Sequence, residues 1–202
     1  MKKLISIVAL LFVSFAVKAQ DFEPYKAFGL QVSKRFTNLN IKDSEDVELT
    51  STGQAGRGFD VIAHYDNGVK KWFGVGVGLG ISSIGSSVGG DKQLYYAVLP
   101  LRMQIKVGSL WLEPGLENRF FLWMDEGNRP NYVNSKSANT YHLAGNLGLR
   151  FKLFRGLSIN AGVYASITPV ISLEKVDTKF GDTYYNSIAG FVGVRYMFNQ
   201  PY

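Results

Sequence analysis

The sequence predicts an all-β protein, an eight-stranded antiparallel up-and-down β-barrel that crosses a membrane through its strands. Three observations support this fold class. Apolar and polar residues alternate with a period of two in eight segments, short and long connections between those segments alternate along the chain, and aromatic residues concentrate at the segment ends. The 202 residues include 22 glycines and no cysteine, which excludes disulfides, thiolate metal sites and cysteine nucleophiles.

The N-terminal residues 1–19 are predicted to be a cleaved export signal, which leaves 20–202 as one β-barrel domain. Two lysines precede a short apolar run over 4–17, and small residues stand at the cleavage positions before and at Ala19. This apolar run is too short to cross a bilayer as a helix. Removal of the segment's three lysines lowers the formal net charge from +6 to +3, so the chain loses its main resemblance to a nucleic-acid-binding protein.

Each alternating segment is predicted to be a strand, because a period of two places successive side chains on opposite faces of a sheet. The eight segments are 27–36, 58–65, 72–82, 95–106, 112–122, 141–152, 157–168 and 187–198. One face is apolar, and the other carries most of the charge within the strands. We expect the apolar face to meet lipid, since a closed barrel with a polar interior leaves no strand edge unpaired in hydrocarbon.

The connections predict the orientation of the barrel. The joints at 66–70, 107–110 and 154–156 are short, and Asp66-Asn67-Gly68 is a typical hairpin-turn sequence. The joints at 37–56, 83–93, 124–139 and 170–185 are long and polar. Short turns on one side and long loops on the other are typical of outer-membrane barrels, with the turns and both termini in the periplasm and the loops outside the cell.

Aromatic residues on the apolar face are predicted to form two girdles at the membrane interfaces. The girdle beside the long loops contains Phe36, Phe59, Tyr95, Phe120 and Tyr141, and the girdle beside the short turns contains Tyr65, Phe73 and Phe151, followed by Tyr196 and Phe198. Aliphatic residues predominate between them. Lys34 is the only charge predicted on this face, where it either reaches a lipopolysaccharide phosphate or marks the end of the hydrocarbon zone.

The polar face is predicted to fill the lumen with ion pairs, because eight strands enclose a space that side chains can occupy. The expected network contains Asp60, Arg102, Lys106, Glu113, Glu117, Arg150 and Arg195. Counting outward from the short turn puts Lys106 near Glu113 and Arg102 near Glu117, and Glu113 also reaches Arg150. Buried charges are costly unless they are paired, so this network predicts a plug and not an aqueous channel.

The pattern resembles the small eight-stranded outer-membrane proteins of the OmpA and OmpX type, and more closely the outer-membrane β-barrel domain common in Bacteroidetes. In the last strand, Gly193, Tyr196 and Phe198 resemble the glycine and aromatic signal that the barrel-assembly machinery recognises, although Phe191 stands where that signal usually has a polar residue. The resemblance implies that the chain lies among outer-membrane lipid and lipopolysaccharide and is inserted by that machinery. PorT-like members of the broad family imply a further role in secretion or transport assemblies.

Catalytic and ligand-binding alternatives have less support in the sequence. A lipid-modifying hydrolase needs a serine activated by a histidine, and neither His64 nor His142 has a serine two residues on. The remaining possibility is that His142 meets Ser166 or Ser187 across the rim. The glycine run 74–80 alternates as a strand, so it does not form a phosphate-binding turn before a helix. The acidic residues Asp43, Glu45, Asp46 and Glu48 match no calcium-loop spacing. No metal or cofactor is predicted.

Three residues fit the strand pattern poorly. Asn118 falls on the lipid-facing side, and Pro100 and Pro114 remove ladder hydrogen bonds within strands. A bulge near Gly115 is expected to relieve Pro114. The leading functional hypothesis is a non-enzymatic outer-membrane barrel that contributes to envelope integrity, or to surface interaction with a protein partner, through its loops. The alternatives are a component of a secretion or transport assembly, a narrow pore, and a lipid-modifying enzyme.

Overall fold

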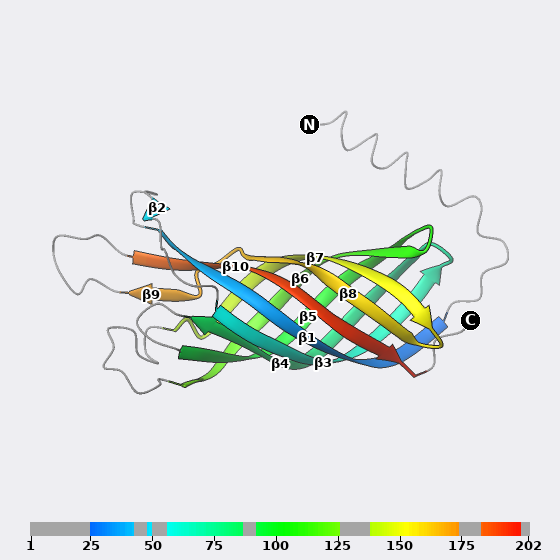
Figure 1. Cartoon of the computed structure of the whole chain (residues 1–202), viewed down its shortest axis with the longest axis horizontal. Coiled ribbons are helices and arrows are strands. Elements are labelled where there is room, and N and C mark those ends of the chain that lie inside the picture. Colours follow the sequence, from blue (N-terminus) through cyan, green and yellow to red (C-terminus); the bar gives the residue numbers. More distant parts are fainter. Residues whose placement is uncertain are drawn as a thin grey trace, which may run out of the picture.

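The computed structural model describes residues 25–42, 48–49, 56–86, 92–125, 138–173 and 183–198, so the predicted export signal lies outside the described residues. Two short strands, β2 (Glu48–Leu49) and β9 (Ile171–Leu173), pair with β1 and β10. Eight long strands form the wall (Figure 1): β1 (Tyr25–Lys42), β3 (Gly56–Lys70), β4 (Phe73–Ser86), β5 (Lys92–Val107), β6 (Leu110–Asp125), β7 (Tyr141–Phe154), β8 (Leu157–Ser166) and β10 (Thr183–Met197).

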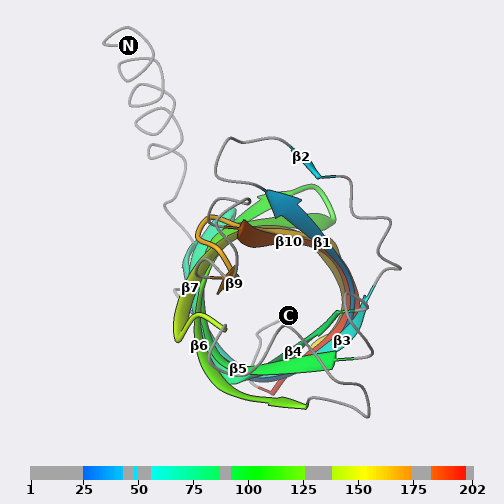
Figure 2. The same ribbon diagram turned by 90° about the vertical axis from the view of Figure 1, so that its left-hand side faces the viewer.

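The eight long strands close into a barrel. Each pairs antiparallel with its neighbours along the chain, and β10 pairs with β1 from Gly29↔Met197 to Lys42↔Tyr184. The view along the barrel shows the resulting ring (Figure 2). Closure leaves neither edge of the wall unpaired, which confirms the predicted antiparallel up-and-down barrel. All eight segments predicted from the alternation of apolar and polar residues coincide with these strands, and none extends more than two residues beyond its strand.

The first turn differs from the prediction. Asp66, Asn67 and Gly68 continue β3 and pair with Gly76, Val75 and Gly74 of β4, and the chain reverses at Lys71–Trp72. A register shift between Gly68 and Lys70 accommodates the longer hairpin. The prediction was wrong because it rested only on the local turn preference of these three residues. The pairing of β3 with β4 continues through them and brings Asp66 into the lumen.

The other two short turns lie where the sequence predicts them. β5 and β6 are joined by Gly108–Ser109, and β7 and β8 by Arg155–Gly156. Gly108 has a φ of 63° and Gly156 a φ of 78°, and glycine adopts this left-handed conformation without steric cost. These turns and the ends of β1 and β10 lie at one end of the barrel, which we call the turn end; the opposite end is the loop end (Figure 1).

Both strand prolines are accommodated without the bulge expected near Gly115. The β5–β6 register is the same at Arg102↔Gly115 and Ile105↔Leu112, but no partners are paired between them, beside Pro114. The β4–β5 ladder has a similar gap beside Pro100, between Val77↔Leu101 and Gly80↔Val98. The real register shift in β6 lies near the loop end, where Tyr95 pairs with Trp123 and Tyr96 with Phe121. Leu122 is the extra residue of this bulge.

The two faces of the wall differ in polarity as the alternation predicts. Many large apolar side chains on the outer face are 37–64% exposed, whereas the side chains that point inward are mostly buried. Among the described residues, we find no helix with the length and apolarity that a membrane span requires. The inward face also contains an apolar cluster, which is formed by Ile62, Ile84, Leu94, Tyr96, Val98, Ala138 and Val170.

Candidate functional site

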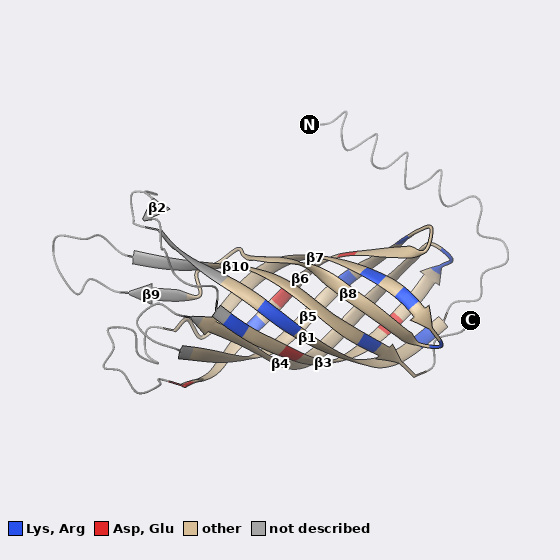
Figure 3. Ribbon diagram, viewed as in Figure 1, with Lys and Arg blue, Asp and Glu red and all other residues tan. Residues whose placement is uncertain are grey.

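The described strands concentrate buried charge in the lumen, where we distinguish two clusters. The loop-side cluster consists of Arg35, Asp60, Glu117 and Arg119, and the turn-side cluster consists of Asp66, Arg102, Glu113, Arg150 and Arg195. All nine side chains belong to residues that are no more than 8% exposed. Figure 3 shows the charged positions along the strands. Burial at this level makes charge pairing the main determinant of their energetics.

Glu117 is the centre of the loop-side cluster. Its carboxylate accepts hydrogen bonds from Arg119 Nη2 at 2.5 Å, from Arg35 Nη2 at 3.0 Å and from Asn146 Nδ2 at 3.2 Å. Arg35 also donates from Nε to both oxygens of Asp60 at 2.6 Å. Two arginines are therefore matched by two carboxylates, and the contacts join residues of β1, β3, β6 and β7 across the lumen.

Tyr164 supports the same two arginines from β8. The guanidinium of Arg119 lies 4.3 Å from the centre of its ring and that of Arg35 lies 4.8 Å from it, which are distances typical of cation–π contacts. The Tyr164 hydroxyl is 3.0 Å from Nε2 of His142, and the His142 ring stacks on Tyr96 at 5.1 Å between ring centres. This aromatic layer connects the loop-side cluster to the apolar cluster.

Glu113 is the centre of the turn-side cluster. Arg195 donates to both of its oxygens, from Nη1 at 3.1 Å and from Nη2 at 2.9 Å. Arg150 Nε forms an ion pair with it at 2.9 Å, and Arg102 Nη1 lies 3.9 Å away. Asp66 is 3.4 Å from Arg150 and 3.6 Å from Arg195. Three arginines face two carboxylates, so this cluster carries one excess positive charge.

Polar atoms without a hydrogen-bond partner also accumulate near the turn-side cluster. Within the described part of the chain, these include His64 Nε2, Asp66 Oδ1, Arg150 Nη2 and both amide atoms of Gln104. Gly76 gives Asp66 and Gln104 the space they occupy, since a Cβ atom there would lie 2.6 Å from Asp66 Oδ1 and 3.0 Å from Gln104 Nε2. The loop-side cluster has such atoms as well, among them Arg35 Nη1 and, beside it, His142 Nδ1. Groups of this kind are ordinarily satisfied by water.

Six of the seven residues predicted for the lumen network are brought together there: Asp60, Arg102, Glu113, Glu117, Arg150 and Arg195. Lys106 is an exception, because it is exposed at the turn end with its Nζ 5.9 Å from the Trp111 ring centre. The predicted pairs Lys106–Glu113 and Arg102–Glu117 are wrong. The two-residue turn places Lys106 opposite Trp111 and Arg102 opposite Gly115, a register two residues from the one expected.

The sequence-based network also missed several members. Arg35 and Arg119 lie on the polar face that the alternation identifies, so this signal was present and a full listing of that face finds them. Gln31, a polar-face residue of β1, accepts hydrogen bonds from Arg102 Nη1 at 3.1 Å and from Arg195 Nη2 at 3.0 Å. Asp66 was missed because it belongs to the turn-like sequence that proved to be strand.

The geometry of His142 does not match a serine hydrolase. Its Nε2 contacts the Tyr164 hydroxyl, and its Nδ1 has no hydrogen-bond partner within the described residues. Ser166 Oγ instead accepts a hydrogen bond from the Ser187 backbone N–H at 3.0 Å. A search of the described residues for three or more clustered metal-ligating side chains finds none. The acidic residues Asp43, Glu45 and Asp46, and the side chain of Glu48, lie outside the described part.

The outer wall carries the aromatic residues predicted for the girdles. Near the loop end, Tyr95 stacks on Trp123 at 4.6 Å and lies 6.4 Å from Phe59, and Phe120 lies 5.3 Å from Tyr141. Trp123 was not predicted, because the bulge at Leu122 interrupts the alternation. Near the turn end, Tyr65 lies 4.9 Å from Phe28. Phe36, Phe73 and Phe151 also point outward, with Phe36 46% and Phe151 43% exposed.

Two polar residues on the outer wall have partners close by. Asn118 accepts a hydrogen bond from the Tyr141 hydroxyl at 2.9 Å and donates to the Leu99 carbonyl oxygen at 3.4 Å. Its amide is therefore tolerated on an apolar face. Lys34 extends along the wall with its Nζ 5.5 Å from the centre of the Phe36 ring. This position is compatible with both of the roles predicted for it.

The predicted assembly signal lies at the seam that closes the barrel. Tyr196 and Phe198 point outward and contact each other at 5.2 Å, and the Phe198 N–H donates to the Phe28 carbonyl oxygen at 2.7 Å. A Cβ atom on Gly193 would lie 2.3 Å from the Val32 carbonyl oxygen, so glycine is required for β10 to approach β1. Recognition by the assembly machinery stays a prediction.

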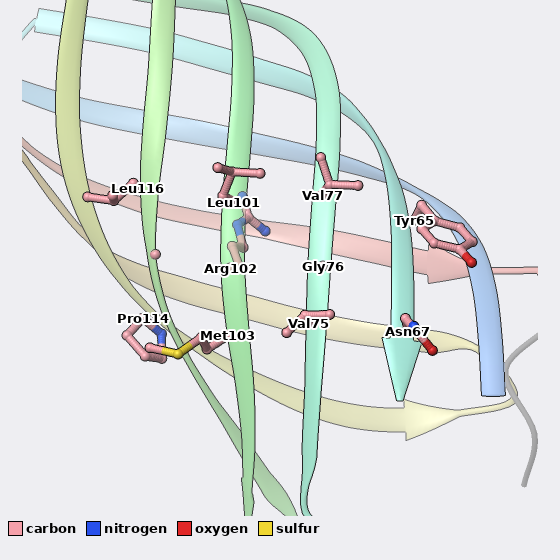
Figure 4. A pocket seen from close by; sticks show the side chains of 11 residues that line it. Tyr65, Asn67, Val75, Gly76, Val77, Leu101, Arg102, Met103, Pro114 and Leu116 are labelled. Atoms are coloured by element: carbon pink, nitrogen blue, oxygen red, sulfur yellow. The ribbon is translucent and has the colours of Figure 1, made fainter. Parts of the chain in front are cut away.

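The outer wall also contains a groove of about 490 Å³ across β3, β4, β5 and β6 (Figure 4). Its walls are aliphatic side chains, and Gly76, Gly115 and Pro114 form part of its lining. The groove lies where the β5–β6 ladder is interrupted between Arg102↔Gly115 and Ile105↔Leu112. The gap in the ladder beside Pro114, which has no backbone N–H, opens this part of the wall, whereas the missing side chains of Gly76 and Gly115 would lie on the lumen side.

Comparison with one solved structure supports the fold, and two others are also similar to the chain. Neisserial surface protein A is 14% identical, with 85% of this chain and 97% of that chain covered and a TM-score of 0.52. OprG from Pseudomonas aeruginosa is 11% identical over 87% of this chain and 96% of that one, with a TM-score of 0.44. Ail of Yersinia pestis is 16% identical over 88% and 100%, with a TM-score of 0.42. No protein-family model and no curated protein matches the chain.

Proposed function

We propose that the chain is an integral outer-membrane β-barrel that does not conduct ions and that presents its loop end for envelope integrity or surface interaction. The apolar outer wall supports insertion into hydrocarbon, because the exposure of many large apolar side chains on all eight long strands is unfavourable in water. The fold shared with Neisserial surface protein A supports the choice of membrane. We expect outer-membrane lipid and lipopolysaccharide around the barrel.

The observation that carries the proposal is the set of contacts at Glu117. Arginines from β1 and β6 and an asparagine from β7 converge on this one carboxylate, which is 1% exposed. Ion permeation requires a continuous aqueous path, and these side chains and that of Asp60, which reach into the lumen from four strands, support its closure. The barrel then serves as a scaffold, and specificity comes from the long connections at its loop end.

Oxygen accessibility of spin labels in reconstituted vesicles tests the membrane placement. Labels at Val77 and Val163 on the outer wall are expected to relax strongly with bilayer-dissolved oxygen, whereas a label at Glu117 in the lumen is not. Strong relaxation at position 117 with weak relaxation at 77 and 163 would contradict the proposal. A detergent-free, monodisperse preparation of the refolded mature chain would also contradict it.

Planar-bilayer recording tests closure of the lumen. The unmodified protein is expected to show no stable conductance. A matched Arg35→Ala/Arg119→Ala variant, which removes the two large side chains around Glu117, is expected to show openings once its insertion has been verified. A stable large conductance of the unmodified protein would refute closure. In cells, a deletion strain with envelope sensitivity supports the proposed role, whereas recovery of a secretion or transport assembly in a pull-down favours that alternative.

A further inference from the structure

The groove in the outer wall has the chemistry of a hydrocarbon-binding site. Val75, Val77, Leu101, Met103 and Leu116 line it, and each is 37–47% exposed on the outward face. Figure 4 shows these side chains around the hollow, with Arg102 behind the β5 ribbon. An acyl chain packs favourably on such a surface, and the groove is built into the paired backbone of four strands.

The turn-side rim of the groove is polar. Tyr65 and Asn67 of β3 line the groove beside Val77 and Val75, with which they pair. Both are partly exposed, and they offer a hydroxyl and an amide beside the apolar lining. A groove that is apolar toward the middle of the barrel and polar toward the turn end matches a lipid whose headgroup lies at the turn end.

Lysines gather at the turn end below the groove. Lys70 and Lys71 lie at the β3–β4 turn, and Lys106 lies near the β5–β6 turn. The Lys106 backbone N–H donates to the Trp72 carbonyl oxygen at 2.7 Å, so these two turns are held together. Among the described residues at this end, every carboxylate is buried in the lumen network, whereas the cationic side chains outside it are Lys26, Lys70, Lys71, Lys106, Lys152 and Arg155.

We propose that the groove binds one anionic phospholipid of the leaflet at the turn end, which is the periplasmic leaflet in the orientation proposed above. One acyl chain lies along Val75, Val77 and Met103, and the phosphate lies near Lys70 and Lys71. Cationic side chains next to an apolar surface attract anionic headgroups more strongly than zwitterionic ones. This inference rests on the proposed insertion into the outer membrane.

Native mass spectrometry of the refolded mature protein tests this proposal, with phosphatidylglycerol and phosphatidylethanolamine of identical acyl chains as probes. We expect one retained phosphatidylglycerol, bound about tenfold more tightly than phosphatidylethanolamine. Val75→Trp, which fills the groove, is expected to abolish retention of this lipid. Its matched control is Val163→Trp, which places the same ring on the outer wall of β8, away from the groove, and is expected to have no effect.

Charge removal separates a specific site from general attraction. Lys70→Gln/Lys71→Gln is expected to reduce the phosphatidylglycerol preference about tenfold, whereas Lys152→Gln/Arg155→Gln removes two cations from the same end at the β7–β8 hairpin and leaves the preference unchanged. Equal binding of both lipids, or equal loss in each variant and its control, would overturn the proposal. If spin labels first establish insertion, either of these outcomes rejects the lipid site but leaves the proposed function standing. Failure of the protein to insert rejects both the lipid site and the proposed function.

Discussion

The two charge clusters in the lumen are built from the same types of side chain, arginine and carboxylate, but differ in their net charge. In the loop-side cluster, two arginines meet two carboxylates, and Tyr164 covers both guanidinium groups. In the turn-side cluster, three arginines meet two carboxylates, and Arg102 is 3.9 Å from the nearest of them. The loop-side cluster is neutral, whereas the turn-side cluster holds one positive charge more than its carboxylates neutralise.

This difference predicts that the loss of an arginine has opposite effects on the net charge of the two clusters. Removal of a carboxylate from the turn-side cluster increases its excess positive charge. Removal of an arginine from the loop-side cluster leaves that cluster with an excess negative charge. Removal of an arginine from the turn-side cluster instead restores neutrality. Breaking a buried pair costs about 3–5 kcal/mol because it leaves an uncompensated charge in a poorly solvated site. Net charge, not the number of contacts, should therefore order the effects.

The largest effect is expected for Glu113→Gln. This substitution removes the central carboxylate of the turn-side cluster and leaves three arginines facing Asp66 alone, so we expect a loss of about 5 kcal/mol in the free energy of unfolding. Urea unfolding in lipid vesicles, followed by tryptophan fluorescence, measures it. Adding Arg102→Gln to this variant should recover part of the stability, whereas adding Lys106→Gln should not, and equal recovery by both would contradict the charge argument.

The sequence predicts which face of a strand each charged residue lies on, but not which residue it pairs with across the hairpin. Alternation places Glu113, Arg150 and Arg195 on the inner face, because the side-chain period is a property of the strand itself. The pairing of Arg102 depends on the register of the β5–β6 hairpin, and a turn of two residues there shifts every partner by two positions relative to the predicted pairing. Sequence alternation carries no information on that offset.

Asp66 illustrates a second limit. Its neighbours Asn67 and Gly68 have strong turn preference, yet β3 continues to Lys70, because pairing with β4 and β1 satisfies the backbone on both sides. Local propensity is weaker than two ladders of hydrogen bonds, and only the completed barrel reveals this. The loop-side cluster also depends on the completed barrel, because the contact between Arg35 and Glu117 joins residues 82 positions apart in the sequence.

A smaller effect is expected for Arg119→Gln in the balanced cluster. The substitution removes a cation that is fully buried between Glu117 and Tyr164, and it leaves Arg35 facing two carboxylates. We expect the free energy of unfolding to fall by about 3 kcal/mol, measured as above. Protonation relieves an excess carboxylate, so the loss should shrink as the pH is lowered toward 4, whereas a loss independent of pH would indicate packing as its cause.

The smallest effect is expected for Arg102→Gln. This change also removes a buried arginine, but it brings the turn-side cluster to two arginines and two carboxylates, and the glutamine can retain the contact with Gln31. We expect a change of less than about 1 kcal/mol, with either sign, in the same unfolding measurement. Lys106→Gln four residues away provides the baseline for losing an exposed cation from β5. If Arg102→Gln were as damaging as Arg119→Gln, the excess charge would have to be neutralised by a group outside the five residues of the cluster, and the contrast between the two halves of the lumen would disappear.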